Sequence, residues 1–142
     1  MKKSFFAVAA SVAVMASCGS TKVASDMTAL NGEWSIVEVN GTKINAEDSE
    51  TAPFLGFDAK ESRLYGNTGC NMLTGALKAD MKKGTIDFSQ TGSTRMMCAD
   101  MKTERLVLDA LEQSTKFKVD GSDKMTLNDK SGKTVIVLKK RK

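Results

Sequence analysis

Few residue types in this chain could carry out catalysis. Its 142 residues include no histidine, which removes serine and cysteine nucleophiles that need an imidazole base, and every imidazole metal site. Acids, serines and lysines are present, but the sequence marks no two acids as a facing catalytic pair. The glycine-rich segment 66–71 lacks the Gly-Lys-Ser/Thr ending of a phosphate loop and is interpreted as a tight turn or bulge. We therefore expect a protein that is not an enzyme and has no cofactor.

The three cysteines are interpreted by their positions. Cys18 lies at the N-terminal end, which leaves Cys70 and Cys98 as a pair. In an oxidising compartment a disulfide is the economical interpretation, and it would stabilise the fold by about 3 to 4 kcal/mol. A redox-active pair is the alternative, but the Cys-x-x-Cys spacing is absent. Soft donors for Cu(I) are offered by Met96, Met97, Cys98 and Met101, yet methionine is also a common core filler and Met101 has a predicted core position, so no metal site is expected.

The N-terminus has the pattern of a cleavable signal peptide. Two lysines precede an apolar run at 5–15, which is followed by Ala16, Ser17 and Cys18. A membrane-spanning helix needs about 20 apolar residues, more than this run contains. The ending resembles a bacterial lipobox, in which the cysteine carries the lipid anchor, with Met15 in place of the usual aliphatic residue. The alternative is an ordinary secreted protein cleaved near Ala16.

Three segments follow from this interpretation: a signal peptide at 1–17, a lipidated tether at 18–29 and a globular domain at 30–142. Gly19 is not the aspartate that retains many lipoproteins in the inner membrane, and no acidic run typical of surface display follows Cys18. The expected location is therefore the periplasmic face of the outer membrane, with the membrane contacted through the Cys18 lipid.

The net charge gives little support for nucleic-acid binding. Removing residues 1–17 takes away two lysines, so Lys plus Arg falls from 21 to 19 against 17 Asp plus Glu, a net charge of +2. The remaining basic run is the C-terminal segment 139–142, which we interpret as a solvated tail or a contact for anionic lipid headgroups. No basic stripe interleaved with aromatics appears, so no nucleic-acid partner is expected.

Alternating apolar and polar residues dominate the domain and predict strands. The predicted strands are 34–39, 54–57, 63–65, 72–79, 85–89, 115–119, 124–128 and 133–139. The first ends at Asn40 and Gly41, a strong hairpin signal because both residues accept a positive φ. Short connections imply antiparallel neighbours. The expected fold is α+β, mainly antiparallel β, with a bent and partly barrel-like sheet whose open side is covered by one helix.

That helix is predicted at 100–114, with Asp100 as its N-cap. Its apolar arc at 100° per residue consists of Met101, Val107, Leu108 and Leu111. Glu104 falls inside this arc, where a carboxylate needs a partner or a proton. One interpretation is structural: an ion pair with Arg95 or Arg63, hydrogen bonds from backbone donors, or a first-turn acid favoured by the helix dipole. The other is an acid that lines a ligand site.

The order of several short motifs resembles the META/HslJ family of small bacterial envelope domains. The motifs are 30–34 (LNGEW), 66–71 (GNTGCN) with Gly75, 86–88 (IDF), 94–98 (TRMMC), and Glu104 with Leu111. The resemblance implies a bent antiparallel sheet with one helix, found in exported lipoproteins linked to heat shock and to novobiocin resistance, and no established reaction. It also supports a Cys70–Cys98 disulfide. The candidate structural or ligand-site residues on these motifs are Trp34, Asn71, Thr94, Arg95 and Glu104.

The function expected from the sequence is that of a non-enzymatic envelope protein, which binds an unknown envelope partner or supports the envelope under stress or antibiotics. The alternative is a carrier of a lipid or other apolar small molecule in a half-open barrel. A hydrolase is a third hypothesis.

Overall fold

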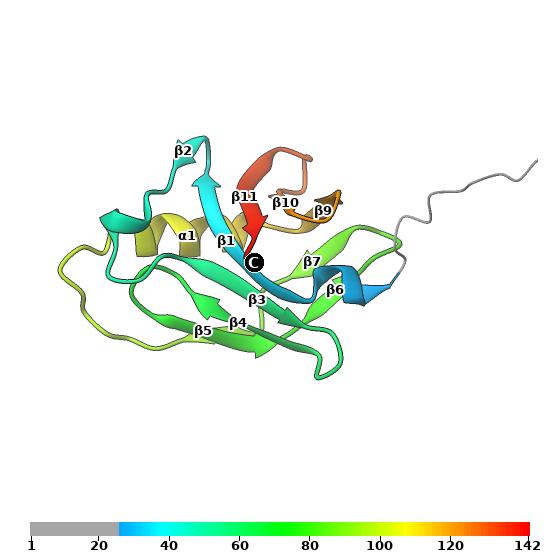
Figure 1. Ribbon diagram of the computed structural model, residues 1–142, viewed down its shortest axis with the longest axis horizontal. Helices are drawn as coiled ribbons and strands as arrows, with labels where there is room; N and C mark the ends of the chain where they lie inside the picture. The colour runs from blue at the N-terminus through cyan, green and yellow to red at the C-terminus, as the bar shows by residue number, and fades with distance from the viewer. Residues whose placement is uncertain (1–25) are drawn as a thin grey trace, which may run out of the picture.

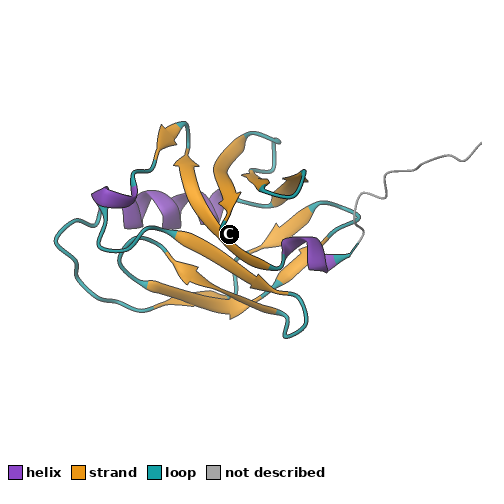
Figure 2. Ribbon diagram, in the orientation of Figure 1, coloured by secondary structure: helices purple, strands orange, loops and turns teal. Residues whose placement is uncertain are grey.

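The computed structural model describes residues 26–142, so the predicted signal peptide and Cys18 lie outside the described residues. The elements in chain order are η1 (Met27–Leu30), β1 (Gly32–Val39), β2 (Thr42–Lys43), η2 (Ala46–Asp48), β3 (Phe54–Asp58), β4 (Arg63–Asn67), β5 (Met72–Ala76), β6 (Lys78–Asp80), β7 (Thr85–Asp87), β8 (Thr91–Ser93), α1 (Lys102–Gln113), β9 (Lys116–Asp120), β10 (Lys124–Asn128) and β11 (Thr134–Lys140). Figure 2 shows the mostly antiparallel β half-barrel with one α-helix that the sequence predicts.

The sheet curls because two strands that are consecutive in the sequence, β5 and β6, lie near its opposite ends. The strand order is β6-β7-β9-β10-β11-β1-β3-β4-β5-β8, with β2 paired to β1. β5 ends at Ala76 and β6 begins at Lys78, so a single residue, the buried Leu77, joins the next-to-last strand of this path to its first strand. The chain therefore bends through Leu77 from one side of the half-barrel to the other (Figure 1).

The predicted hairpin at Asn40 and Gly41 is confirmed. Their φ angles are 47° and 80°, and Val39 faces Thr42 across the β1–β2 pair. Both central residues thus adopt the left-handed backbone that a type I′ turn requires.

Several strand predictions differ from the structure. The predicted strand 85–89 ends at Asp87 as β7, and the two-residue strand β2 was predicted only as the far side of the hairpin turn. The predicted strand 72–79 is divided into β5 and β6, because the two parts pair with different neighbours, β4 and β7. Strand β8 was not predicted: its three residues are too few to show a period, and its pairing partner, β5, lies far back in the sequence.

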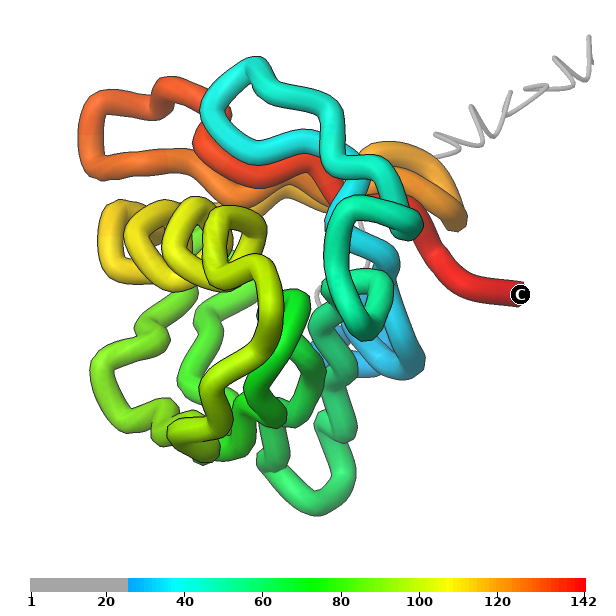
Figure 3. Tube along the Cα trace, turned by 90° about the vertical axis from the view of Figure 1, so that its left-hand side faces the viewer, coloured from blue at the N-terminus to red at the C-terminus, as the bar shows by residue number. Residues whose placement is uncertain are grey.

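Helix α1 covers the open side of the curled sheet and packs on β1 and β11. Figure 3 shows it between the β10–β11 hairpin and the strands that lead to β8. Its buried residues Val107, Ala110 and Leu111 join a single core with fully buried side chains such as Trp34 and Leu138. The barrel interior is therefore filled by side chains. Within residues 26–142, no helix is long and apolar enough to cross a membrane.

Candidate functional site

The first turn of α1 buries a carboxylate, as its place in the apolar arc predicts. Glu104 is only 3% exposed, next to the buried Thr103. The predicted N-cap is wrong by one residue: Met101 is the cap and makes no side-chain cap bond. Asp100 Oδ1 instead accepts a hydrogen bond from the Lys102 amide at 2.8 Å, so its carboxylate still satisfies one of the free amides at the helix start.

The loop after β4 is shaped to meet this helix turn. Asn67 Oδ1 accepts from the Gly69 amide at 2.8 Å, and Gly69 has a φ of +119°, where side chains are strained. A Cβ at Gly69 would lie 3.2 Å from Thr103 Cγ2. The glycine therefore allows both the turn and the close approach of loop and helix.

Both oxygens of Glu104 are occupied by donors from this loop. Oε2 accepts from the Thr68 hydroxyl at 2.5 Å and from the backbone amides of Cys70 and Asn71, each at 3.1 Å. Oε1 accepts from Asn71 Nδ2 at 2.9 Å. Hydrogen bonds to an ionised group are shorter and stronger than neutral ones, and here they replace the water lost on burial.

These donors set the protonation state of the buried acid. Burial by itself raises the pKa of Glu104. Hydrogen bonds from the Thr68 hydroxyl, the Asn71 side chain and the two backbone amides outweigh burial, so the pKa of this carboxyl lies below its ordinary value. Glu104 is therefore an anion at neutral pH, with no proton to donate.

Asn71 links this carboxylate to a third segment of the chain. Its Oδ1 accepts from the Met96 amide at 2.6 Å and from the Thr94 hydroxyl at 2.9 Å, and its Nδ2 donates to the Met96 carbonyl at 3.2 Å. The neighbouring Cys70 forms a disulfide with Cys98, with a Cα–Cα distance of 6.0 Å. We call the group Thr68, Cys70, Asn71, Thr94, Cys98 and Glu104 the Glu104 cluster. It fastens loop 94–98 and the loop after β4 to the start of α1.

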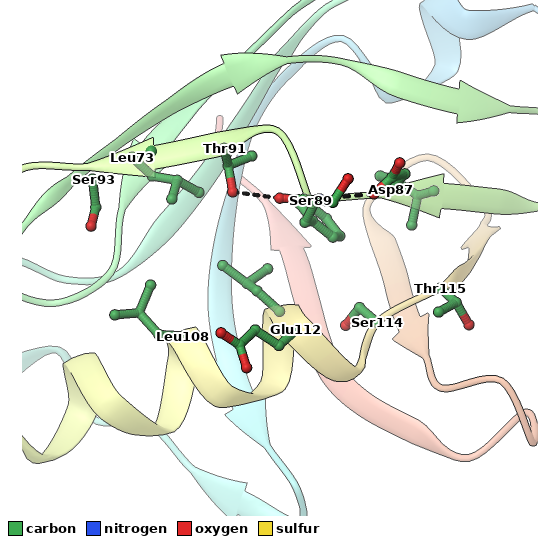
Figure 4. A pocket seen from close by; sticks show the side chains of 13 residues that line it. Leu73, Asp87, Ser89, Thr91, Ser93, Leu108, Glu112, Ser114 and Thr115 are labelled. Carbon is green, nitrogen blue, oxygen red and sulfur yellow. Dashed lines mark hydrogen bonds between the residues drawn. The ribbon is translucent and has the colours of Figure 1, made fainter.

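A groove of about 550 Å³ lies at the other half of the same helix. One wall comes from the end strand β8 and its neighbour β5, including Leu73, Thr91 and Ser93, and the opposite wall from α1, including Leu108 and Glu112 (Figure 4). The remaining lining residues are Ile86, Asp87, Phe88, Ser89, Gly92, Leu111, Ser114 and Thr115. Its volume is within the range of about 300 to 1,000 Å³ typical of ligand sites. We call it the β8–α1 groove.

Comparison with known proteins identifies the fold family. The family model described as META domain matches residues 25–142. The chain belongs to the META domain family. Every residue of the Glu104 cluster lies on one of the short sequence motifs, 66–71, 94–98 and Glu104, that resemble the META/HslJ family. No curated protein matches the chain.

Solved structures share the fold of this META domain. An NMR structure is 20% identical with a TM-score of 0.59, covering 78% of this chain and 89% of that one. An NMR structure of a protein from Burkholderia xenovorans is 21% identical, with a TM-score of 0.59 and coverage of 79% and 83%. A crystal structure of a DUF4847 family protein from Bacteroides vulgatus is 16% identical, with a TM-score of 0.54 and coverage of 80% and 96%. At these identities the likeness concerns the fold alone.

The predicted arginine partner of Glu104 is wrong. The Arg95 side chain is exposed, and Arg63 lies over the Tyr65 ring at 5.2 Å from its centroid. The salt bridge found among the described residues joins Arg141 Nη1 to Glu33 Oε2 at 3.2 Å and does not involve Glu104. The partners of Glu104 are instead backbone amides, a hydroxyl and a side-chain amide, none of which carries a charge.

The other predicted residues of the META domain divide between core and cluster. Trp34 is fully buried, and its indole N–H donates to the Leu30 carbonyl at 2.8 Å, so it belongs to the core. Asn71, Thr94 and Glu104 lie together in the Glu104 cluster. The residues of the β8–α1 groove were missed as a site, because the strand that forms its wall was not predicted.

The C-terminal basic run is not a free tail in this META domain. Lys140 Nζ lies 4.8 Å from the centroid of the Trp34 ring. The Arg141 guanidinium lies 4.1 Å from the Phe54 ring centroid and donates to the Ser35 hydroxyl at 2.9 Å. Cation–π contact and hydrogen bonding thus hold these residues against the sheet.

The methionines of loop 94–98 are mostly exposed. Met96 is 54% and Met97 is 88% exposed, together with Met72 at 63%. Met101 is half-buried at the helix start. Among the described residues, no group of three or more histidine, cysteine, aspartate or glutamate side chains is placed to hold a metal ion.

Proposed function

We propose that this META domain protein is a non-catalytic binding module of the bacterial cell envelope, and that the β8–α1 groove is its binding site. The observation that carries the proposal is the contrast in hydrogen bonding around α1. The Glu104 cluster uses its polar groups internally. In the groove the Thr91 and Ser114 hydroxyls are also used internally, but the Ser93 hydroxyl and the Glu112 carboxylate make no hydrogen bond within the described chain and lie beside apolar side chains. Concave sites of this composition bind ligands.

The chemistry of the Glu104 cluster supports binding rather than catalysis. General acid–base catalysis needs a group that gains and loses a proton near the working pH. Glu104 is held as an anion by several donors, and its pKa is displaced downward, away from neutrality. The residues around it hold two loops to the helix, so this buried acid has a structural role.

The groove also accommodates the alternative of an apolar small-molecule carrier. The interior of the half-barrel is filled by the core, including Trp34, Phe57 and Leu138. An apolar ligand would therefore occupy the β8–α1 groove against Leu73 and Leu108 rather than the barrel interior. Both candidate functions predict the same site and differ in what it holds.

We further propose that lipid on Cys18 holds the protein at the periplasmic face of the outer membrane, where it supports the envelope under stress or antibiotics. The support is the lipobox-like ending before Cys18 and the lack of an aspartate at Gly19. In Cys18→Ser protein, labelled fatty acid should not be incorporated, and the protein should leave the membrane fraction or remain a precursor. Fatty-acid incorporation into Cys18→Ser protein would refute the anchor.

Native mass spectrometry of the mature protein, extracted from its own envelope in mild detergent, tests the binding site. Ser93 points into the groove opposite Leu108 (Figure 4), so Ser93→Trp should fill the groove. Thr74→Trp is the matched control: Thr74 is exposed on the neighbouring strand β5, lies opposite Gly92 and does not line the groove. Wild type and Thr74→Trp should retain a bound partner or ligand that Ser93→Trp loses. Equal retention by all three proteins would contradict the proposed site.

A further inference from the structure

Strand β8 leaves one side of its backbone unpaired within the described chain. It ends the hydrogen-bonded path and pairs only with β5. The Thr94 amide donates to the Met72 carbonyl at 3.1 Å, which makes these two residues a hydrogen-bonded antiparallel pair. Such pairs alternate along a ladder, so Gly92 faces β5 with its backbone groups, and Thr91 and Ser93 face away from it.

The outward backbone groups are therefore the Ser93 amide, the Ser93 carbonyl and the Thr91 carbonyl. The Thr91 amide is already used, since it donates to the Phe88 carbonyl at 3.1 Å. Natural edge strands are often protected by lysine, proline or a short length. β8 has neither lysine nor proline, and its three residues give enough hydrogen bonds to align one further strand without offering a long edge for aggregation.

The groove lies on the side-chain face of β8, next to the open edge of that strand. Thr91 and Ser93 line one wall and α1 lines the other, with Leu108 and Leu111 as its apolar residues (Figure 4). Neighbouring strands lie about 4.8 Å apart. A strand added to the open edge of β8 would therefore lie beside the groove, and those of its side chains that share the face of Thr91 and Ser93 would point toward Leu108 on α1.

The charge of the groove has a single sign. Of its thirteen lining residues, the ionisable ones are Asp87 and Glu112, both acidic. Lys78 lies opposite Asp87 on β6, outside the lining. Hydrogen bonds from the side chain and amide of Ser89 hold the pKa of Asp87 below its ordinary value, so this acid is ionised at neutral pH. The groove thus favours a cationic occupant.

We infer that the open edge of β8, with the β8–α1 groove beside it, binds an extended cationic peptide segment by strand addition: its main chain pairs with Thr91 and Ser93, and its side chains on the groove face include apolar ones that point toward Leu108 and basic ones that approach Asp87 and Glu112. This inference rests on the proposed function and names the class of ligand. Strand addition obtains affinity from main-chain hydrogen bonds and specificity from alternate side chains.

Two other occupants fit the groove less well. A lipid chain would cover the outward amide and carbonyls of β8 without supplying hydrogen bonds, which leaves polar groups desolvated. A second copy of this chain, paired through β8 on β8, would bring a second Asp87 and Glu112 toward the first pair, and like charges would oppose the contact.

Fluorescence anisotropy with full-length mature protein tests the inference. The probe is a labelled, end-capped seven-residue peptide, Lys-Thr-Val-Thr-Val-Thr-Lys, which carries its lysines and valines on one face of an extended strand and is called the lysine–valine peptide. It should bind saturably, and binding should weaken with salt. The same peptide with alternate backbone nitrogens methylated should bind at least about tenfold more weakly, because it loses main-chain donors. The glutamate–valine peptide, which has glutamate in place of both lysines, should show no saturable binding.

Protein variants locate the contact. Ser93→Pro removes the outward amide and should weaken binding of the lysine–valine peptide about tenfold, while Thr74→Trp, outside the groove lining, should bind as wild type does. Asp87→Asn with Glu112→Gln should weaken binding and reduce its salt dependence. The N-methylated peptide tests main-chain pairing on unaltered protein, so the inference stays testable even where Ser93→Pro unfolds.

Three results would overturn the inference. Equal binding of the methylated and unmethylated peptides would exclude main-chain pairing, and binding of the glutamate–valine peptide would exclude charge selection. If the lysine–valine peptide does not bind, the peptide ligand is excluded. The proposed binding site would still stand if native mass spectrometry then shows a lipid or a second copy of the chain bound to wild type and lost from Ser93→Trp. Equal retention by wild type and Ser93→Trp would remove the site itself.

Discussion

The two halves of α1 face different surroundings. At the start of the helix, Glu104 is buried among donors that occupy both of its oxygens, and the Cys70–Cys98 disulfide lies beside it. In the second half, Leu108 and Glu112 face a groove whose other wall is a strand edge with unpaired backbone groups. A polar group that is satisfied internally contributes to stability, whereas polar and apolar groups left open beside a cavity are available to a partner.

This comparison separates stability from binding, and variants at each half of the helix should affect only one of them. Residues of the Glu104 cluster should change the free energy of unfolding. Residues of the groove should change ligand retention with little effect on that free energy, because surface substitutions usually change stability by less than about 0.5 kcal/mol.

The largest expected effect is loss of the disulfide. Replacing both Cys70 and Cys98 by serine should lower the free energy of unfolding by about 3 to 4 kcal/mol, the range for closing a loop of this order in the chain-entropy model. Urea unfolding of the mature protein, with the same m-value fitted to wild type and variant, measures the change. A difference near zero would show that loop 94–98 is held by the Asn71 hydrogen bonds alone.

A smaller loss is expected from Glu104→Gln. The substituted amide brings a donor toward the backbone amides that now face Oε2, so the unfolding free energy should fall by about 1 to 3 kcal/mol. Glu112→Gln is the matched control on the exposed side of the same helix and should change it by less than about 0.5 kcal/mol. Similar effects of the two substitutions would contradict the structural role of Glu104.

The dependence of stability on pH should show the smallest of these effects. The pKa of Glu104 is lower in the folded chain than its ordinary value, so its stabilising contribution is present above the unfolded pKa and is lost as pH falls through the folded one. Unfolding free energies measured from neutral to acid pH should therefore fall more steeply for wild type than for Glu104→Gln. The surface carboxyls Asp80, Asp87 and Asp129 also have lowered pKa values, but they are present in both proteins. Parallel curves would indicate that Glu104 does not couple to folding.

The sequence predicted the structural half of this comparison better than the binding half. A helical period is a local property, so it placed Glu104 on the buried arc of α1 correctly. Backbone donors were expected as an alternative to an arginine, but which residues supply them was not predictable in the same way. Two of the four donors are backbone amides in a loop more than thirty residues earlier, and every residue but proline carries such an amide. The choice of Arg95 or Arg63 followed from charge alone and was wrong for this reason.

The groove depends on contacts that the sequence does not mark. Its wall β8 has the residues Thr, Gly and Ser, too short a run for a period, and it exists as a strand because it pairs with β5. The bend at Leu77, which closes the half-barrel, likewise follows from β6 pairing with β7 rather than from a turn residue. Non-local pairing created both features, and so the candidate binding site appeared only in the folded chain.

One paired measurement tests the central claim that stability and binding are separated along α1. Melting temperature and ligand retention by native mass spectrometry are determined on the same preparations of wild type, Glu104→Gln and Ser93→Trp. The account predicts that Glu104→Gln melts at a lower temperature but retains the ligand while folded, and that Ser93→Trp melts near wild type but has lost it. If Glu104→Gln loses the ligand with an unchanged melting temperature while Ser93→Trp retains it, the binding site lies at the Glu104 cluster and the account is wrong.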